Sequence, residues 1–453
     1  MMTLLPILLP EAEMSKLRQQ HMPVMWHDLT HEDSDTPAVD SPLTEKASLI
    51  GRIGLLLLAS GAGAYRVRAA MNKISRALKV TCNADIGIKS ISYTCIQGNE
   101  SCTNALSNRT TGVNTSKLNY LEMFCDGFTE RAGRYSIDSF HNMLDTIDKC
   151  GGNYAVWQLC LASGAACGAF AFLLGAGWIE ILCTFAAAAA GFLVRKLLLN
   201  HSYTLFANVS AAVLTSCFTY IVLIKAVSAA LHVPADYRAG YICSILFIVP
   251  GFPLITGGID IAKLDLKSGI ERIVYSLMVV CVAALTCAFT ASLLNYSPVD
   301  FPVYELDMPV KMALRLVMSF VGVFGFSMLF NSTPKMALTA GLMGMIANFL
   351  RLLLTDFGLK VGIAAFVGAF LSGIMASAIK RIVGIYPRIT LTVPSIVIMV
   401  PGMFLYKGIH FLSSGDFDQG GVWLWKAIMI IASLPLGLVF ARIITDKNFA
   451  KSS

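Results

Sequence analysis

Ten stretches of this sequence are long and apolar enough to cross a lipid bilayer, and they constrain the fold more than any other feature. A membrane-spanning helix needs about 20 predominantly apolar residues. The whole chain is rich in such residues, since 56% of its 453 residues are hydrophobic and 14% are charged. The expected spans are residues 155–174, 178–198, 203–231, 239–261, 270–294, 311–330, 335–355, 359–379, 389–412 and 422–445. The sequence therefore predicts an α-helical polytopic membrane protein with about ten transmembrane helices.

The N-terminal third has a different character. Residues 1–150 carry 15 Lys+Arg and 16 Asp+Glu, whereas the remaining residues carry 20 and 12. We interpret residues 1–42 as a flexible acidic leader, because its polar composition offers little apolar surface to bury. The opening residues lack the basic segment of a signal peptide.

Residues 43–153 are expected to form a small soluble α/β domain. Helical periodicity dominates its beginning, and an alternating, β-branched pattern marks a strand further on. The expected elements are two helices separated at residues 60–63, a strand at 86–96, a loop or hairpin at 99–115, and helices at 117–132 and 137–150.

The sequence predicts no metal site, cofactor or catalytic set. His27 and His31 lie near Asp28 and Glu32 in a pattern that imitates a metal cluster, but we expect a solvated segment. The twelve cysteines show no C-x-x-C spacing, which favours reduced thiols in a cytoplasmic setting. His141 is expected on a helix surface. No nucleophile, base and orienting group occur together in a recognisable pattern.

The spans fall into two similar groups of five, at residues 154–294 and 311–446, joined by a linker at 295–310. The sequence IVPGF at 248–252 corresponds to MVPGM at 399–403, and other matches keep the same order. An odd number of spans in a duplicated unit places the two copies in opposite membrane orientations. We therefore predict two inverted five-helix repeats, an organisation found in many secondary transporters.

The distribution of basic residues predicts the orientation. If the N-terminal domain is cytoplasmic, twelve basic residues of the membrane part fall on the cytoplasmic side and eight on the other. Positive charge accumulates in cytoplasmic loops. The expected location is the cell (inner) membrane, with both termini inside.

The segment VPGFPLITGGID at residues 249–260 predicts a broken helix within a span. Pro250 and Pro253 remove two backbone donors, and an interrupted helix is tolerated only where it is buried in protein or lines a watery cavity. The half-helix ends carry partial charges of opposite sign, which suit a zwitterionic amino acid. The expected substrate-binding residues are Pro250, Gly251, Phe252, Pro253, Thr256, Gly257, Gly258, Pro401 and Gly402.

Asp260 is the candidate for proton coupling, since intramembrane carboxylates often carry protons. Two alternatives stay open: the break could serve helix packing alone, and Asp260 could lie at the membrane surface beside Lys263. The second copy carries Lys407 and His410 near the matching position, so the two halves would differ chemically.

Other charged residues rank lower. Glu180 and Arg351 are expected at the membrane interface. Glu271 and Arg272 could form a cytoplasmic gate pair, although an ordinary surface pair is the more common arrangement.

Four motifs together resemble the threonine/serine exporter family in its fused form, with an N-terminal soluble domain and ten spans. They are SGAGAYRV at 60–67, GVNTSKL at 112–118, YSIDSFHNMLDTI at 135–147, and VPGFPLITGGID. The resemblance extends over about residues 44–445.

The resemblance implies a secondary active exporter of L-threonine and L-serine driven by the proton motive force. Its partners would be the amino-acid substrate, protons and the lipid bilayer, without nucleic acid, cofactor or metal. The oligomeric state is left open, a homo-oligomer included. The alternative is a membrane-anchored enzyme or sensor whose activity lies in the N-terminal domain.

Overall fold

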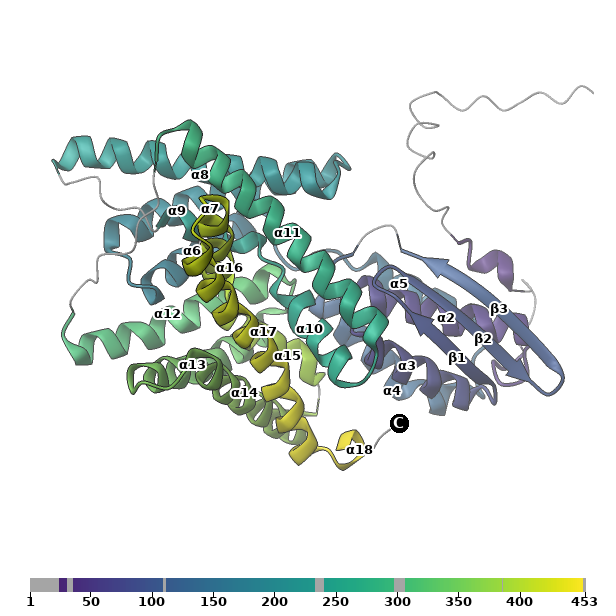
Figure 1. The fold of residues 1–453 in the computed structure, drawn as a ribbon. Helices are drawn as coiled ribbons and strands as arrows, with labels where there is room; N and C mark the ends of the chain where they lie inside the picture. Colours follow the sequence, from purple (N-terminus) through teal and green to yellow (C-terminus); the bar gives the residue numbers. More distant parts are fainter. Residues whose placement is uncertain are drawn as a thin grey trace, which may run out of the picture. The chain divides into compact units, whose positions relative to one another are not determined.

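The computed structural model shows a predominantly helical chain (Figure 1). It divides into two compact units, of which the first comprises residues 1–112 and 120–150 and the second comprises residues 113–119 and 151–453. The residues that the structure describes are 24–30, 36–108, 111–232, 240–296, 306–384 and 386–450.

The first unit combines helices with a three-stranded antiparallel sheet in the order β1-β2-β3. Its elements are η1 (His27–Leu29), α2 (Leu43–Ala59), α3 (Ala64–Ala77), β1 (Thr81–Ile86), β2 (Ser90–Gln97), β3 (Glu100–Ser107), α4 (Thr115–Arg131), whose first residues belong to the second unit, and α5 (Ile137–Lys149). Helix α2 is the central element, because most of its residues are buried. The Tyr93 hydroxyl of β2 donates to the Ala47 carbonyl over 2.8 Å and so ties the sheet to this helix.

The second unit contains long helices and two interrupted ones. Its elements are α6 (Val156–Leu173), α7 (Trp178–Asn200), α8 (Leu205–Leu231), α9 (Gly240–Cys243), η2 (Leu246–Ile248), α10 (Gly251–Ala262), α11 (Leu266–Leu293), α12 (Met308–Leu329), α13 (Pro334–Asp356), α14 (Val361–Val383), α15 (Arg388–Ile396), η3 (Val397–Met399), α16 (Gly402–Ser413), α17 (Phe417–Thr445) and α18 (Lys447–Ala450).

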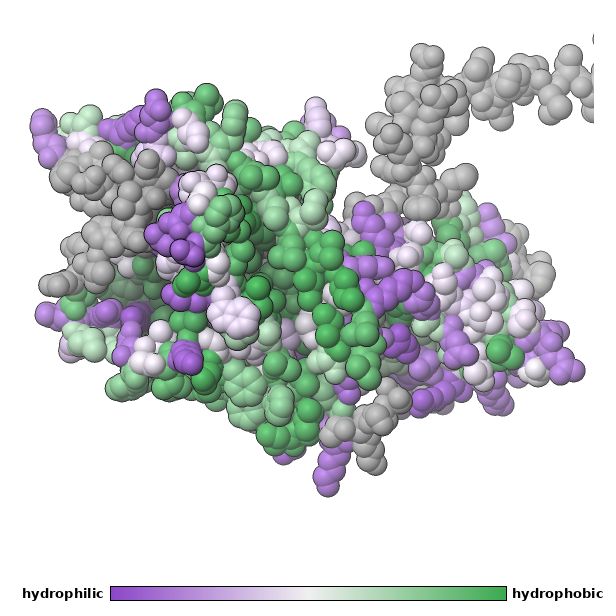
Figure 2. All heavy atoms as spheres, viewed as in Figure 1, coloured by the Kyte–Doolittle hydropathy of each residue, from purple (hydrophilic) through white to green (hydrophobic). Residues whose placement is uncertain are grey.

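Among the described residues, eight helices are long and apolar enough to cross a membrane, and the number rises to ten if each bent pair counts as one span. Their outer surfaces are apolar, as lipid contact requires. Leu182 on α7 and Phe289 on α11 expose 70% and 62% of their surface, respectively. In the face shown in Figure 2, hydrophobic residues cover much of the second unit and hydrophilic residues predominate over the first. The chain is a polytopic membrane protein.

Helix packing follows the same scheme in both groups of five spans. Helix α8 packs on α11 as α14 packs on α17, and α9 contacts α6, α7 and α8 as α15 contacts α12, α13 and α14. The two groups meet reciprocally, because α10 packs on α17 while α16 packs on α11. Helices α6 and α12 also pack directly on each other.

Candidate functional site

Two spans are broken at a proline, at corresponding places in the two groups of helices. In the first broken span, α9 and η2 form one half and α10 forms the other, and the two halves meet at a bend of 60° at Pro250. In the second, α15 and η3 form one half and α16 forms the other, with a bend of 44° at Pro401. Each proline precedes the first residue of the second half-helix, where its missing N–H leaves no hydrogen bond unmade. The structure thus contains the break that the VPG motif predicts.

The two breaks lie against each other. A Cβ atom added to Gly251 would come within 2.7 Å of Cγ2 of Val397 and 3.1 Å of Cγ2 of Val400. A Cβ atom on Gly402 would come within 3.0 Å of Leu246 and of Val249. Each glycine therefore permits a close approach of the opposite break, and the contact is reciprocal.

The crossing of the two breaks is apolar and nearly filled. A cavity of about 20 Å³ lies beside it, which is room for about one water molecule and not for an amino acid. Its wall consists of Ile242, Ile245, Leu246, Ile248, Val249, Val280, Ala283, Ala284, Gly402 and Tyr406. The structure is therefore closed at this point.

Polar side chains serve the interrupted backbone on both sides. Arg195 donates from Nη1 to the Phe247 carbonyl of η2 over 3.2 Å. In the other broken span, the Ser395 hydroxyl lies 2.5 Å from the Ser372 hydroxyl and donates to the Thr392 carbonyl. These contacts supply partners within protein where a lipid-exposed break would have none.

Asp260 is buried among the helices, with 1% of its surface exposed. Its Oδ2 atom lies 3.3 Å from Nε of Arg272 and accepts a hydrogen bond from the Ser268 hydroxyl over 3.3 Å. Arg272 is 4% exposed, so the surface position expected for it beside Glu271 is wrong. A buried charge is costly without a partner, and here each ion has the other.

The remaining predicted residues of the first break pack closely against neighbouring helices. The Phe252 ring makes an edge contact with Phe330 at 5.4 Å between centroids, and the Thr256 hydroxyl donates to the Phe252 carbonyl. A Cβ atom on Gly257 would meet the Gly269 carbonyl of α11, and one on Gly258 would meet the Pro435 ring of α17. The structure brings Gly251 and Gly402 together at the crossing, while Gly257 and Gly258 face α11 and α17.

The second break carries basic and aromatic side chains instead of a carboxylate. Nζ of Lys407 lies 4.6 Å from the centroid of the Trp423 ring, and the His410 ring stacks on Tyr406 with a centroid distance of 6.0 Å. Among the described residues, Nδ1 of His410 is buried without a hydrogen-bond partner. The two halves therefore differ chemically although their backbones break alike.

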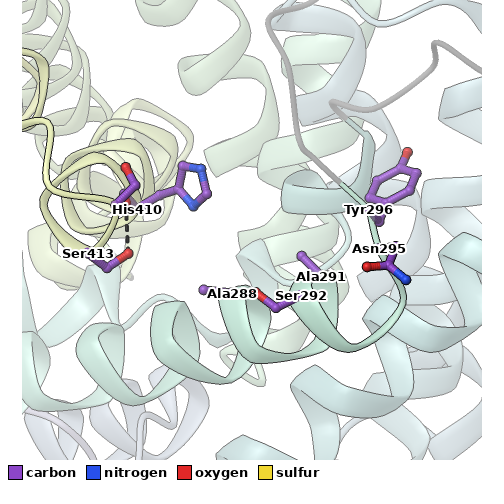
Figure 3. A pocket seen from close by; sticks show the side chains of 8 residues that line it. Ala288, Ala291, Ser292, Asn295, Tyr296, His410 and Ser413 are labelled. Carbon is purple, nitrogen blue, oxygen red and sulfur yellow. Dashed lines mark hydrogen bonds between the residues drawn. The ribbon is translucent and has the colours of Figure 1, made fainter.

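A larger cavity, of about 490 Å³, lies where α11 and α16 end, and we call it the α11/α16 cavity. Figure 3 shows His410 and Ser413 of α16 across from Ser292 of α11, with Asn295 and Tyr296 after the end of α11. Its lining is Ala288, Ala291, Ser292, Asn295, Tyr296, His410, Ser413 and Ser414. This cavity has room for a small polar molecule, and among its lining residues only His410 is singled out by the sequence pattern.

One face of α16 connects this cavity to the crossing of the breaks. Gly402, Tyr406 and His410 follow at intervals of four residues, which places them on one side of the helix. Gly402 and Tyr406 line the small cavity, whereas His410 lines the large one. Helix α11 contributes to both cavities in the same way, so the two spaces follow one another between α11 and α16.

Glu180, which is expected at the membrane interface, lies in the first turn of α7, at the start of a candidate span. It is fully buried, and its carboxylate accepts hydrogen bonds from the Gly177 amide over 3.1 Å and from the Gly240 amide over 3.3 Å. Glu180 therefore caps the first turn of α7 and also reaches the start of α9, a contact between residues 60 positions apart.

The first unit contains a buried polar cluster around His141. This residue is fully buried, in contrast to the helix surface expected for it, because α2 and η1 cover its face of α5. Nη1 of Arg52 lies 3.2 Å from Nδ1 of His141, and Ser48 Oγ lies 3.1 Å from Nε2. His27 is also held in the cluster, since its Nδ1 lies 2.6 Å from the Asp138 carboxylate. His31 and Glu32 lie outside the described residues.

This cluster does not have the geometry of a nucleophile and its base. Arginine can only donate, so Nδ1 of His141 accepts and the ring proton resides on Nε2. Nε2 then donates to Ser48 Oγ, whose own proton goes to the Glu45 carbonyl over 2.8 Å. Burial, followed by the charge of Arg52, lowers the pKa of His141 to about 3. The imidazole is thus a neutral structural donor to the serine.

Comparisons with known proteins agree on transport. The chain matches the ThrE family model, described as "Putative threonine/serine exporter", over residues 48–294, and the ThrE_2 model, "Threonine/Serine exporter, ThrE", over residues 315–444. Two relatives are each named "Probable succinate transporter subunit YjjP". The one from Klebsiella aerogenes is 27% identical over 229 residues, which cover 48% of this chain and 82% of the relative. The one from Escherichia coli is 25% identical over 244 residues, which cover 51% and 88%. No solved structure matches the chain.

Proposed function

Because the chain belongs to the threonine/serine exporter family and is a transporter, not an enzyme, we propose that it is a secondary active exporter of L-threonine and L-serine driven by the proton motive force. The observation that carries this proposal is the reciprocal contact between the two broken spans. Val400 packs against Gly251, and the corresponding residue of the other break, Val249, packs against Gly402. The substrate would bind at this crossing, around residues 250–258 and 401–402, when the two breaks separate.

The arrangement of the helices supports two inverted repeats. The two groups of five spans share one packing scheme, and α10 with α17 mirrors α16 with α11. Helices α11 and α16 end together at the α11/α16 cavity, while α11 begins next to the end of α10. The 28 residues of α11 cover about 42 Å, so the ends of α10 and α16 lie on opposite sides of the membrane. Alternating access would move one repeat against the other around the crossing.

The polarity of the α11/α16 cavity supports a small polar amino acid as substrate. Two helix C-termini converge there, and their partial negative charge favours an ammonium group. Hydroxyl groups of Ser292, Ser413 and Ser414 and the imidazole of His410 offer hydrogen bonds to a hydroxyl or carboxylate. With the first unit in the cytoplasm, as the basic residues predict, this cavity would face the outside.

The buried pair of Asp260 and Arg272 supports proton coupling through Asp260. In the described conformation Asp260 and Arg272 balance each other's charge, and separation of the pair would leave the carboxylate without its counter-charge. Because α10 carries Asp260 and α11 carries Arg272, movement between these helices would change that distance. We propose that Asp260 takes up the coupling proton in this way, in the inner cell membrane.

A second substrate class is favoured by the names of the two relatives, which are described as subunits of a succinate transporter. A C4 dicarboxylate shares the carboxylate of an amino acid and lacks its ammonium group. Measurements of export should therefore compare both classes.

The proposal is tested with everted membrane vesicles that contain the full chain and are energised to be acid inside. We expect accumulation of labelled threonine and serine, abolished by a protonophore and absent from vesicles without the protein. Gradient-dependent accumulation of succinate alone would transfer the assignment to dicarboxylates. Accumulation of neither class would overturn the transport proposal in both forms.

A further inference from the structure

The segment after α17 inserts an aromatic ring between α10 and α17. Phe449 of α18 is 3% exposed. Nζ of Lys263, at the end of α10, lies 3.8 Å from the ring centroid, and the Arg442 guanidinium of α17 lies 4.0 Å from it. Lys263 also donates from Nζ to the Phe449 carbonyl over 2.7 Å. Two cations from two helices thus hold one phenylalanine by its ring and its backbone.

Asp446 anchors the turn that carries this ring. Its carboxylate lies 3.6 Å from Nε of Arg442 and 3.5 Å from Nη1 of Arg388 on α15. The Phe449 amide donates to the Asp446 carbonyl over 3.0 Å. The ring is therefore placed by a defined set of contacts to three helices.

Corresponding residues of the two groups of spans lie 151 positions apart in this region, and their packing corresponds as well. Gly269 lies against Ile261, and Gly420 lies against Leu412, the residue 151 positions after Ile261. Gly257 and Gly408 pack in the same manner against Ile273 and Leu424. Residues that are 151 positions apart therefore have equivalent packing partners in the two groups of spans.

The same offset relates the surroundings of Phe449 to the α11/α16 cavity. Lys263 corresponds to Ser414, Arg442 to Ala291, and Asp446 to Asn295. Those three counterparts all line the α11/α16 cavity. Phe449 accordingly occupies the place between α10 and α17 that is equivalent to this cavity between α11 and α16.

The equivalent place differs from the cavity in its charge. The α11/α16 cavity carries hydroxyls, an amide and an imidazole. The ends of α10 and α17 carry an ammonium and a guanidinium group beside the single carboxylate of Asp446, which Arg388 also contacts, so positive charge is in excess. Burial, and then the charge of Arg442, lower the pKa of Lys263. Two cations held near each other bind an anion better than a neutral ligand, and a carboxylate matches both donors.

We propose that Phe449 closes a second substrate site, between α10 and α17, in which Lys263 and Arg442 receive the carboxylate of the transported molecule when the ring leaves. This inference rests on the proposed transport function. In the export direction, with the first unit in the cytoplasm, the site would be the cytoplasmic mouth of the path. The described conformation is then open at the α11/α16 cavity and closed at the mouth that Phe449 fills.

The test measures access to this site by thiol labelling, which requires no transport. Val439 on α17 is 8% exposed and corresponds to Ala288 of the α11/α16 cavity, so Val439→Cys places a thiol in the site. The full chain in lipid nanodiscs is labelled with an anionic or a cationic methanethiosulfonate. Labelling at residue 439 is read by peptide mass spectrometry, relative to the exposed native Cys150.

With Phe449→Ala in addition, we expect labelling at position 439 to rise at least about tenfold, because ring burial and two cation–π contacts are lost together. The anionic reagent should gain more than the cationic one. Phe417→Ala, at a 73% exposed position near the start of α17, is the matched control and should leave labelling unchanged.

Lys263→Gln keeps the ring and removes one cation, so it should raise labelling by a smaller factor and reduce the advantage of the anionic reagent. This variant keeps the inference testable if Phe449→Ala does not fold. Unchanged labelling in both variants would overturn the closure by Phe449. An equal gain for both reagents would overturn the carboxylate site. Because the readout is access, its failure is distinct from a failure of threonine or serine to be exported.

Discussion

The carboxylate of Asp260 lies 3.3 Å from the guanidinium of Arg272, and both side chains are buried at the junction of α10 and α11. A buried ion pair stabilises little in total, but loss of one partner leaves an uncompensated charge. This asymmetry allows the structural and the coupling roles of Asp260 to be separated.

We expect Asp260→Asn to lower the free energy of unfolding by about 3–5 kcal/mol, because Arg272 loses its counter-charge. Downhill exchange of substrate should persist while gradient-driven accumulation is lost. The double variant Asp260→Asn with Arg272→Gln should regain much of the stability without regaining coupling. Thermal unfolding and vesicle transport measure the two effects. Full coupling in the Asn variant would leave Asp260 with a packing role only.

Gly402→Val should block the crossing of the two breaks. A Cβ atom at this position already approaches Leu246 and Val249 to 3.0 Å, so a larger side chain overpacks the contact and costs about 1–3 kcal/mol. We expect transport to fall more than protein yield does. Gly421→Val is the matched control, since a Cβ atom there would meet no atom of the described residues within 4 Å. Equal transport by the two variants would contradict a role for the crossing.

His410→Gln should weaken substrate binding, because the imidazole lines the α11/α16 cavity and its Nδ1 makes no hydrogen bond within the described part of the chain. Loss of one such hydrogen bond raises KM by about 5- to 10-fold, while kcat changes little if the contact is equal in the ground and transition states. His201→Gln, at an exposed position after α7, serves as the control. A fall in kcat at unchanged KM would contradict this assignment.

Acid should lower the free energy of unfolding of the first unit, because His141 binds a proton more readily when that unit is unfolded. Its pKa is about 3 in the folded chain and near 6.5 when unfolded, so the unfolded state binds more protons between these values. Stability therefore falls as the pH falls, by about 2 kcal/mol between about pH 7 and about pH 5. Asp145, whose pKa the Arg52 hydrogen bond lowers to about 2, adds to the loss only at lower pH.

Hydrogen exchange of α5 in the full chain, corrected for intrinsic rates, measures this effect. His141→Gln should abolish the pH dependence in this window because glutamine does not titrate. A slope that persists in this variant would assign the effect to another group.

The sequence predicted the spans and the two breaks because hydropathy and proline act locally. It could not predict which charges meet. Asp260 and Arg272 are brought together by the turn between α10 and α11, and the sequence alone gives Arg272 an equally good partner in the adjacent Glu271. The second partner of Glu180 could not be predicted for the same reason, since Gly240 belongs to a broken span 60 residues further along the chain.

The first unit shows the same limit. The segment that became β2 alternates clearly, whereas β1, with the sequence TCNADI, has only a weak apolar pattern and was missed. Its pairing with β2 defines it. The burial of His141 depends on η1, which lies 110 residues or more away in a segment whose composition predicts a solvated leader.

Helices α11 and α17 are the longest described helices, with 28 and 29 residues. Their lengths of about 42 Å exceed a hydrocarbon core of about 30 Å, so both must tilt or extend into the headgroups. Each of them lines one of the two sites that face the ends of the path. Longer acyl chains in the surrounding lipid would reduce the tilt of these two helices. A change in bilayer thickness would therefore change the width of both sites.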